Sequence, residues 1–171
     1  AIRFFENKNN IELEIRTKST FVKPMLNNYI SNCIIAYSLT PEKISKKFEI
    51  GVPSLKKRIH SISKLVKLGW KIGLRFDPII CEEGWEELYE FFFKNIFKEV
   101  PSDSIHSVTY GALRFPNRVF KNIEKLYPEE KLFYRKVSLD EQINEENMSL
   151  NIIKKMLEKH IDKKKIFLCL S

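Results

Sequence analysis

The sequence predicts an α/β fold in which about five mostly parallel strands alternate with helices in a single domain. Two observations carry this prediction. Strand patterns and helix patterns follow one another in strict alternation, which is typical of parallel sheets with right-handed crossovers. Residues 33–39 form a continuous apolar run, as expected of a strand buried on both faces. Five strands in 171 residues are too few for a closed eight-stranded barrel, so the sequence indicates half a barrel or an open sheet.

The first elements surround this buried run. The opening residues have the pattern of a helix end, and residues 11–17 alternate between apolar and polar side chains, which predicts a strand. A short helix is expected over residues 20–30, before the strand at 33–39. The polar face of the first strand carries four charged side chains: Glu12, Glu14, Arg16 and, just beyond the strand, Lys18.

The middle of the chain predicts two helices around a strand that carries charges. Pro53 opens a helix with apolar residues at helical spacing, and Gly69 is well suited to end it. The strand 71–77 follows and is expected to end at Pro78. Its alternation places three residues on one face: Gly73, Arg75 and Asp77. An amphipathic helix follows over residues 84–97.

The last third is predicted to hold two more strands. Residues 105–115 form a strand and residues 117–126 a helix. Residues 129–147 are acidic and are expected to be irregular. A helix over residues 148–161 and a final strand over residues 166–170 complete the alternation.

Composition limits the class of protein and of partner. The formal net charge of +8 favours acidic partners such as nucleic acid, although a solvated lysine-rich surface explains the same charge. No apolar run reaches the roughly 20 residues that a membrane span needs. Three widely separated cysteines argue for a reducing, cytoplasmic compartment and against a disulfide framework. The chain begins with Ala1 rather than Met, and we therefore expect a fragment of a longer protein.

Polar residues gather where the predicted strands end. Parallel strands place these ends along one rim of the sheet, where ligands bind in β/α proteins. Lys18, Arg75 and Arg114 would suit an anionic ligand, and Asp77 or Ser38 could hold amine or hydroxyl groups.

Each of these residues also has a purely structural interpretation. Arg75 and Asp77 are spaced to form an ion pair on one face, and Ser38 is placed to be a buried hydroxyl. The charged face of the first strand fits a solvated edge. The run Lys56-Lys57-Arg58 fits a solvated helix face.

Several motifs together resemble the carboxyl-terminal half of the spore photoproduct lyase family, which are radical S-adenosylmethionine enzymes. The resemblance covers residues 11–134 and the last strand. The motifs are Glu14-Ile15-Arg16-Thr17-Lys18-Ser19, Phe48-Glu49-x-Gly51, Ser54-Leu55-x-Lys57-Arg58-Ile59, Gly69-x-x-x-Gly73, Asp77-Pro78-Ile79, Glu83-Gly84-Trp85-Glu86-Glu87-x-Tyr89 and Leu113-Arg114-Phe115-Pro116.

This resemblance implies a partial (β/α)6 barrel, a 4Fe–4S cluster and S-adenosylmethionine, from which the family generates a 5′-deoxyadenosyl radical that reverses a thymine lesion in DNA. Lys18 and Ser38 match the family lysine and serine at the S-adenosylmethionine site. Asp77 falls where the family contacts the cofactor through its backbone. Arg75 and Arg114 are candidates to contact substrate phosphate or the cofactor carboxylate.

Two departures from the family pattern affect this interpretation. The CxxxCxxC loop that holds the cluster is absent, so we expect its ligands upstream, in a missing amino-terminal half of the same protein. The chain alone is then expected to be inactive. Residues 134–150 are acidic and lack the basic, aromatic pattern of the family's DNA-gripping hairpin. A non-catalytic nucleic-acid-binding barrel without a cluster is therefore the alternative hypothesis.

Overall fold

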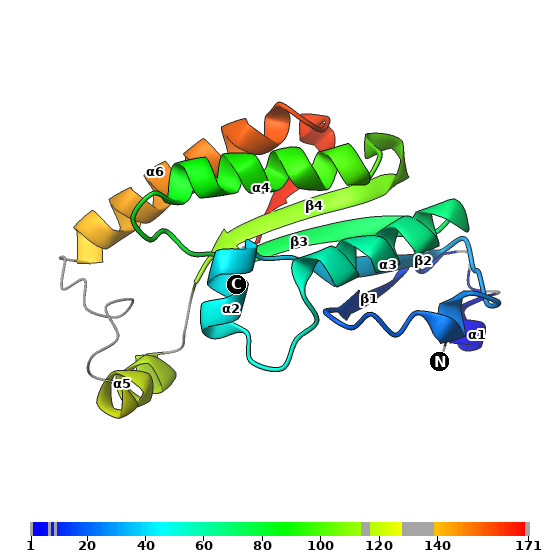
Figure 1. Cartoon of the computed structure of the whole chain (residues 1–171), viewed down its shortest axis with the longest axis horizontal. Helices are drawn as coiled ribbons and strands as arrows, with labels where there is room; N and C mark the ends of the chain where they lie inside the picture. Colours follow the sequence, from blue (N-terminus) through cyan, green and yellow to red (C-terminus); the bar gives the residue numbers. More distant parts are fainter. Residues whose placement is uncertain (1, 7, 9, 114–116, 128–138, 170–171) are drawn as a thin grey trace.

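The structure is a computed structural model that describes residues 2–6, 8, 10–113, 117–127 and 139–169. It contains a five-stranded, all-parallel sheet in which the strands lie side by side in chain order (Figure 1). The predicted α/β class with alternating strands and helices is confirmed. The strands are β1 (Leu13–Thr17), β2 (Cys33–Ser38), β3 (Lys71–Ile79), β4 (Ile105–Ala112) and β5 (Ile166–Leu168).

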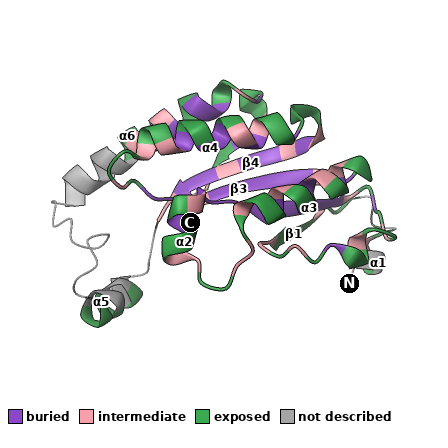
Figure 2. Ribbon diagram, in the orientation of Figure 1, coloured by how far each residue is buried: buried purple, intermediate pink, exposed green. Residues whose placement is uncertain are grey.

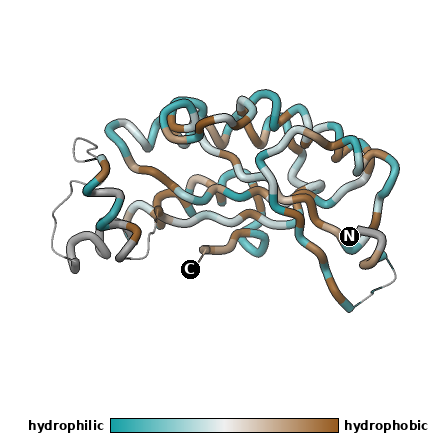
Figure 3. Tube along the Cα trace, turned by 90° about the horizontal axis from the view of Figure 1, so that it is seen from below, coloured by the Kyte–Doolittle hydropathy of each residue, from teal (hydrophilic) through white to brown (hydrophobic). Residues whose placement is uncertain are grey.

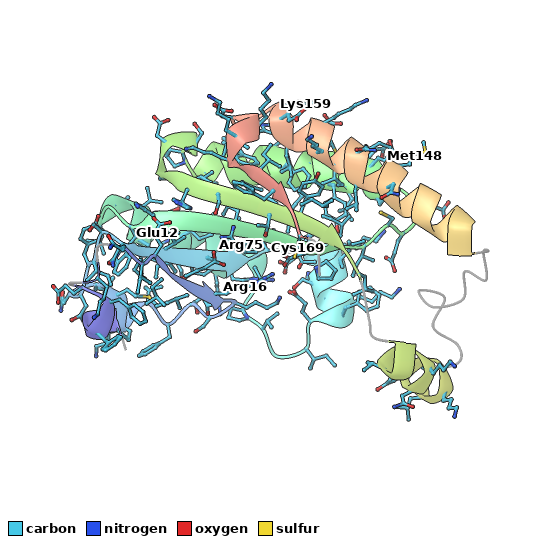
Figure 4. All side chains as sticks on the ribbon, turned by 180° about the vertical axis from the view of Figure 1, so that it is seen from behind. Glu12, Arg16, Arg75, Met148, Lys159 and Cys169 are labelled. Carbon is cyan, nitrogen blue, oxygen red and sulfur yellow. The ribbon has the colours of Figure 1, made fainter. Side chains whose placement is uncertain are left out.

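Three long helices, α3 (Leu55–Lys67), α4 (Trp85–Glu99) and α6 (Leu139–Glu158), are called the main helices below. They cover one face of this sheet, and the strands are in view on the other face (Figures 1 and 4). Sequential strand order with right-handed crossovers puts successive helices on the same side, which is the arrangement of a barrel rather than of a doubly wound sheet. The helices are α1 (Ile2–Phe5), α2 (Glu42–Phe48), α3 (Leu55–Lys67), α4 (Trp85–Glu99), α5 (Asn117–Leu126) and α6 (Leu139–Glu158), with 3-10 turns η1 (Lys23–Met25), η2 (Ser102–Ser104) and η4 (Lys163–Lys165).

The hydrophobic core lies between the sheet and helices α2, α3, α4 and α6 (Figure 2). Ile72, Leu74 and Phe76 of β3 belong to this core, as their alternation predicts. Phe76 packs on the rings of Phe92 and Phe93 of α4 at centroid distances of 5.5 and 5.0 Å. Burial of each such side chain stabilises the fold by about 1.5–3 kcal/mol. The helices alternate between hydrophobic and hydrophilic residues along their length, as amphipathic helices on a sheet should (Figure 3).

The predicted helix over residues 20–30 is wrong. Only the turn η1 forms there, and the connection from β1 to β2 is otherwise irregular. Pro24 supplies no backbone N–H, and the following asparagines are weak helix formers, so a full helix is not sustained. The sequence prediction also missed α2, a helix of only 7 residues.

Several boundaries also differ from the prediction. β4 ends at Ala112 rather than at residue 115, and β5 ends at Leu168 rather than at residue 170. β3 does not stop at Pro78 but continues to Ile79, because the register against β4 shifts between Phe76 and Ile79 and a proline is tolerated at such an irregularity. Residues 139–147 were expected to be irregular but form the first half of α6. Acidic residues are favourable near a helix amino terminus, so acidic composition does not argue against a helix.

Candidate functional site

Charged and polar side chains project from the face of the sheet opposite the main helices. In Figure 4, Glu12, Arg75 and Arg16 lie on this face, ordered from one end of the strands toward the other. The register places Arg16 beside Ala36, and Ala36 beside Gly73, so side chains of β1 and β3 meet over the small residues of β2. At one end of this face, Glu12 pairs with Lys71 at 3.2 Å. Nearer the carboxyl ends of the strands, two further ionic groups form on this face, and a third forms where α2 approaches the strand ends.

The first group is centred on Arg75, which is only 4% exposed. Its Nε donates to Glu14 Oε1 at 3.0 Å and its Nη2 to Glu14 Oε2 at 2.5 Å. Nη2 also donates to Ser107 Oγ at 3.0 Å, and Nη1 donates to the carbonyls of Leu74 and Ser107 at 3.1 and 3.2 Å. A guanidinium carries five N–H donors, so these five bonds use its full capacity.

Gly73 makes this arrangement possible. A Cβ at this position would lie 2.7 Å from Arg75 Nη2 and 3.0 Å from the Cβ of Ala36. The prediction that Gly73 admits a close approach is therefore confirmed, and the approaching group is the guanidinium of Arg75.

The second group lies at the carboxyl ends of β1, β2 and β3. Arg16 Nη2 pairs with Asp77 Oδ1, and Arg16 Nε donates to Ser38 Oγ at 3.2 Å. Thr109 Oγ1 donates to Asp77 Oδ2 at 3.3 Å. The expected pair between Arg75 and Asp77 is not the one that forms, because Glu14 holds Arg75 and Arg16 pairs with Asp77.

The third group joins Lys18 to α2 and α3 through Glu49. Lys18 Nζ lies 3.3 Å from Glu49 Oε1, and Arg58 Nη2 lies 2.9 Å from Glu49 Oε2. Arg58 is fully buried, so its assignment to a solvated helix face is wrong. Its Nη1 donates to the carbonyl of Ser38 at 3.0 Å, which ties this group to the end of β2.

The surroundings of the two carboxylates lower both pKa values. For Glu14, the hydrogen bond from Arg75 is the main cause of the lowered pKa. For Glu49, burial alone would raise the pKa, but the hydrogen bond from Ser45 and the charges of Arg58 and Lys18 outweigh burial and lower it. Both carboxylates are therefore anionic at neutral pH, and each holds its cations in place.

The structure brings Lys18, Ser38 and Asp77 to the same rim, because Ser38 contacts Arg16 on one side and Arg58 on the other. Arg75 is the register partner of Ser38 and lies two residues before Asp77 in β3, where its guanidinium is bound within the sheet. Arg114 lies outside the described residues.

In the described part of the chain, no group of three His, Cys, Asp or Glu residues could hold a metal ion. Burial raises the pKa of the Cys33 thiol to about 11, so this cysteine stays protonated at neutral pH. Across the described residues, no helix is long and apolar enough to cross a membrane.

A family model for spore photoproduct lyase matches residues 1–166, which is nearly the whole chain. This chain belongs to the spore photoproduct lyase family. The spore photoproduct lyase of Bacillus subtilis (strain 168) is 32% identical over 135 residues, which are 77% of this chain and 40% of that protein. The spore photoproduct lyase of Clostridium acetobutylicum is 24% identical over 136 residues, with 77% of this chain and 39% of that protein covered. The chain thus spans about two fifths of the length of these relatives.

Solved structures of spore photoproduct lyase share the fold. A variant with bound AdoMet and dinucleoside spore photoproduct superposes with a TM-score of 0.77 at 19% identity, covering 98% of this chain and 53% of that one. A second variant, with dinucleoside spore photoproduct, gives a TM-score of 0.79 at 19% identity with the same coverage. The five strands and their helices therefore form part of the barrel of this family.

Two residues that organise this rim, Arg16 and Glu49, are not among the site residues that the sequence predicts. Arg16 stands on a charged strand face and in one family motif, and Glu49 stands in another. Alternation with Glu14 was a signal for Arg16, because it puts both residues on the face where Arg75 and Asp77 lie. No local pattern indicates that Glu49 meets Lys18, because this contact joins segments separated by the whole of β2.

Proposed function

We propose that this chain is the cofactor-binding, carboxyl-terminal part of a radical S-adenosylmethionine lyase that repairs a thymine photolesion in DNA. The observation that carries the proposal is the family match over residues 1–166 together with Lys18 and Ser38 at one rim of the sheet. Both residues occupy positions that match cofactor-binding residues of the family, at the strand ends where β/α proteins bind ligands.

The groups at this rim suit S-adenosylmethionine, which carries a carboxylate, an amino group and a ribose diol. Lys18 supplies an ammonium for the carboxylate, and its side chain is 34% exposed. Ser38 accepts a hydrogen bond from Arg16 in this arrangement, so its own hydroxyl proton remains to be donated. Asp77 would contribute backbone atoms, because its carboxylate is occupied by Arg16 and Thr109.

When bound, S-adenosylmethionine would supply a 5′-deoxyadenosyl radical, with methionine as the other product and the electron from a 4Fe–4S cluster. The three cysteines of the described residues do not form a group that could hold a metal ion, so the ligands of the cluster would come from a part of the protein outside these 171 residues. The residues of this chain would then bind and orient the cofactor and form one wall of the substrate cavity.

Substrate contacts are proposed on charge. Arg114, which follows β4 in the sequence, would meet a phosphate of the DNA strand. A direct contact of Arg75 with substrate phosphate or with the cofactor carboxylate remains a prediction. The geometry does not favour it, because the five N–H groups of Arg75 already bind protein oxygens. Arg75 is better suited to fix the strand end that carries Asp77.

The test is anaerobic reconstitution of the full-length protein with iron and sulfide, followed by reduction in the presence of S-adenosylmethionine and dinucleoside spore photoproduct. We expect 5′-deoxyadenosine to form and the dinucleoside photoproduct to be converted to its repaired form. A protein that binds a cluster and forms neither product would contradict the proposal.

The net charge of +8 favours a second candidate, a non-catalytic barrel that binds nucleic acid. Such a module would bind duplex DNA with an affinity that falls steeply with salt and would show no specific S-adenosylmethionine binding. Measurement of both ligands on the same preparation separates the two functions, because only the enzyme binds S-adenosylmethionine.

A further inference from the structure

Glu49 has an unusual number of partners for a carboxylate just beyond a short helix. Its Oε1 accepts from Thr40 Oγ1 at 3.1 Å and lies 3.3 Å from Lys18 Nζ. Its Oε2 accepts from Ser45 Oγ at 2.6 Å and from Arg58 Nη2 at 2.9 Å. Four groups from different segments therefore hold one carboxylate in a single position.

Arg58 is the unusual member of this network because its side chain is fully buried. A buried guanidinium is tolerated only when it is paired and hydrogen-bonded. Its partners are Glu49 Oε2, Ser45 Oγ at 2.9 Å and the carbonyl of Ser38 at 3.0 Å. Arg58 thus joins α3 to the end of β2 and to the carboxylate that meets Lys18.

The charged side chains of this network carry a net positive charge, and Lys18 presents it to solvent. A pair of Lys18 and Glu49 alone would be neutral and would attract an anion weakly. Arg58 adds a second cation behind the carboxylate, so the three side chains carry one net positive charge. Lys18 is also the exposed member, with a side-chain exposure of 34% against 13% for Glu49 and 0% for Arg58.

We propose that Glu49 is a positioning residue that aims Lys18 at the carboxylate of S-adenosylmethionine, and that Arg58 offsets the charge of Glu49 so that Lys18 keeps its attraction for that carboxylate. This proposal rests on the proposed function for the ligand, but the contact between Glu49 and Lys18 can be tested without ligand. It assigns a role to Glu49 and Arg58 that acts through Lys18 rather than on the reacting atoms.

The first test uses the full-length protein without ligand. Acetylation by an N-hydroxysuccinimide ester is followed by mass spectrometry at Lys18, because an ammonium held by a carboxylate reacts slowly. Glu49→Gln should raise the rate at Lys18 several-fold, and Glu49→Asp should do so in part. Thr40→Val is the matched control, because it removes a different partner of Glu49 and should leave the rate at Lys18 unchanged. Equal rates at Lys18 in wild type and in both Glu49 variants would overturn the proposal.

The second test compares two ligands by calorimetry. Glu49→Gln should weaken S-adenosylmethionine binding by about tenfold, the scale of one charge-assisted hydrogen bond. Binding of 5′-methylthioadenosine, which lacks the amino acid carboxylate, should change less than about twofold because Lys18 has no carboxylate to meet. Equal loss for both ligands overturns the positioning role. A wild-type protein that binds neither ligand rejects the proposed function instead, while the acetylation rates still decide whether Glu49 holds Lys18.

Discussion

Arg75 of β3 reaches across β2 to Glu14 of β1 and binds both of its carboxylate oxygens, at 3.0 and 2.5 Å. The pair therefore spans three strands on the face opposite the main helices. Ser107 of β4 accepts from the same guanidinium, so one side chain hydrogen-bonds residues of three strands, β1, β3 and β4, and passes over β2. This arrangement fixes the relative positions of the strand ends at which Lys18, Ser38 and Asp77 lie.

Replacement of Arg75 by Met should destabilise the protein by about 2 kcal/mol. Removal of one partner of a fully buried ion pair lowers the free energy of unfolding by more than this. Here the Glu14 side chain is 39% exposed, so water replaces part of the interaction. Urea denaturation monitored by circular dichroism measures the change. Lys159→Met is the control, because its pair with Glu90 is exposed and should contribute nothing measurable. An Arg75→Met variant as stable as wild type would contradict the bridging role.

Gly73→Ala should destabilise the fold by about 1–3 kcal/mol, as overpacking of a filled site does. The added methyl would meet the guanidinium of Arg75, which its five hydrogen bonds prevent from moving away. A double-mutant cycle checks the cause: in the Arg75→Met background the same substitution should cost clearly less. Equal cost in both backgrounds would show that the strain does not come from Arg75.

The stability of the protein should fall in acid partly through Glu14. Its pKa is lowered in the folded state by Arg75, so its contribution is present above the unfolded-state pKa of about 4.3 and is lost as pH falls through the lower folded-state value. Urea midpoints at pH 6 and at pH 3.5 measure this loss. Glu14→Gln should show a smaller drop between the two pH values than wild type, and an equal drop would count against the ion pair.

The sequence predicted the architecture because hydrophobic periodicity determines which face of each element is buried. The alternation of Ile72, Leu74 and Phe76 with Gly73, Arg75 and Asp77 is enough to assign both faces of β3. The helix over residues 20–30 failed because a few apolar residues at helical spacing do not offset Pro24 and its neighbours.

For the rim, the sequence predicted which residues lie at the strand ends but not which of them pair. Strand ends follow from the alternation, so Lys18, Ser38 and Asp77 could be placed together. Ion-pair partners depend on tertiary geometry, so the sequence suggested Arg75 for Asp77, whereas the structure pairs Asp77 with Arg16. The burial of Arg58 could not be predicted either, because a basic run on a helix usually faces water.

Asp77→Asn tests whether Asp77 serves the cofactor through its backbone. The variant keeps the backbone and the size of the side chain, and it loses the charge that meets Arg16 and one of the two acceptor oxygens, which bind Arg16 and Thr109. S-adenosylmethionine affinity should then stay within about threefold of wild type, less than the loss of one hydrogen bond to a charged group. A loss of a hundredfold or more would assign the carboxylate itself to the ligand.

The most direct test of the strand-end site is the affinity of the full-length protein for S-adenosylmethionine with Lys18 replaced by Met. We expect a loss of about 10- to 100-fold, the value of a charge-assisted hydrogen bond to a carboxylate. Lys43→Met, an exposed lysine on α2, should leave the affinity unchanged. Wild-type affinity in the Lys18→Met protein would contradict the account.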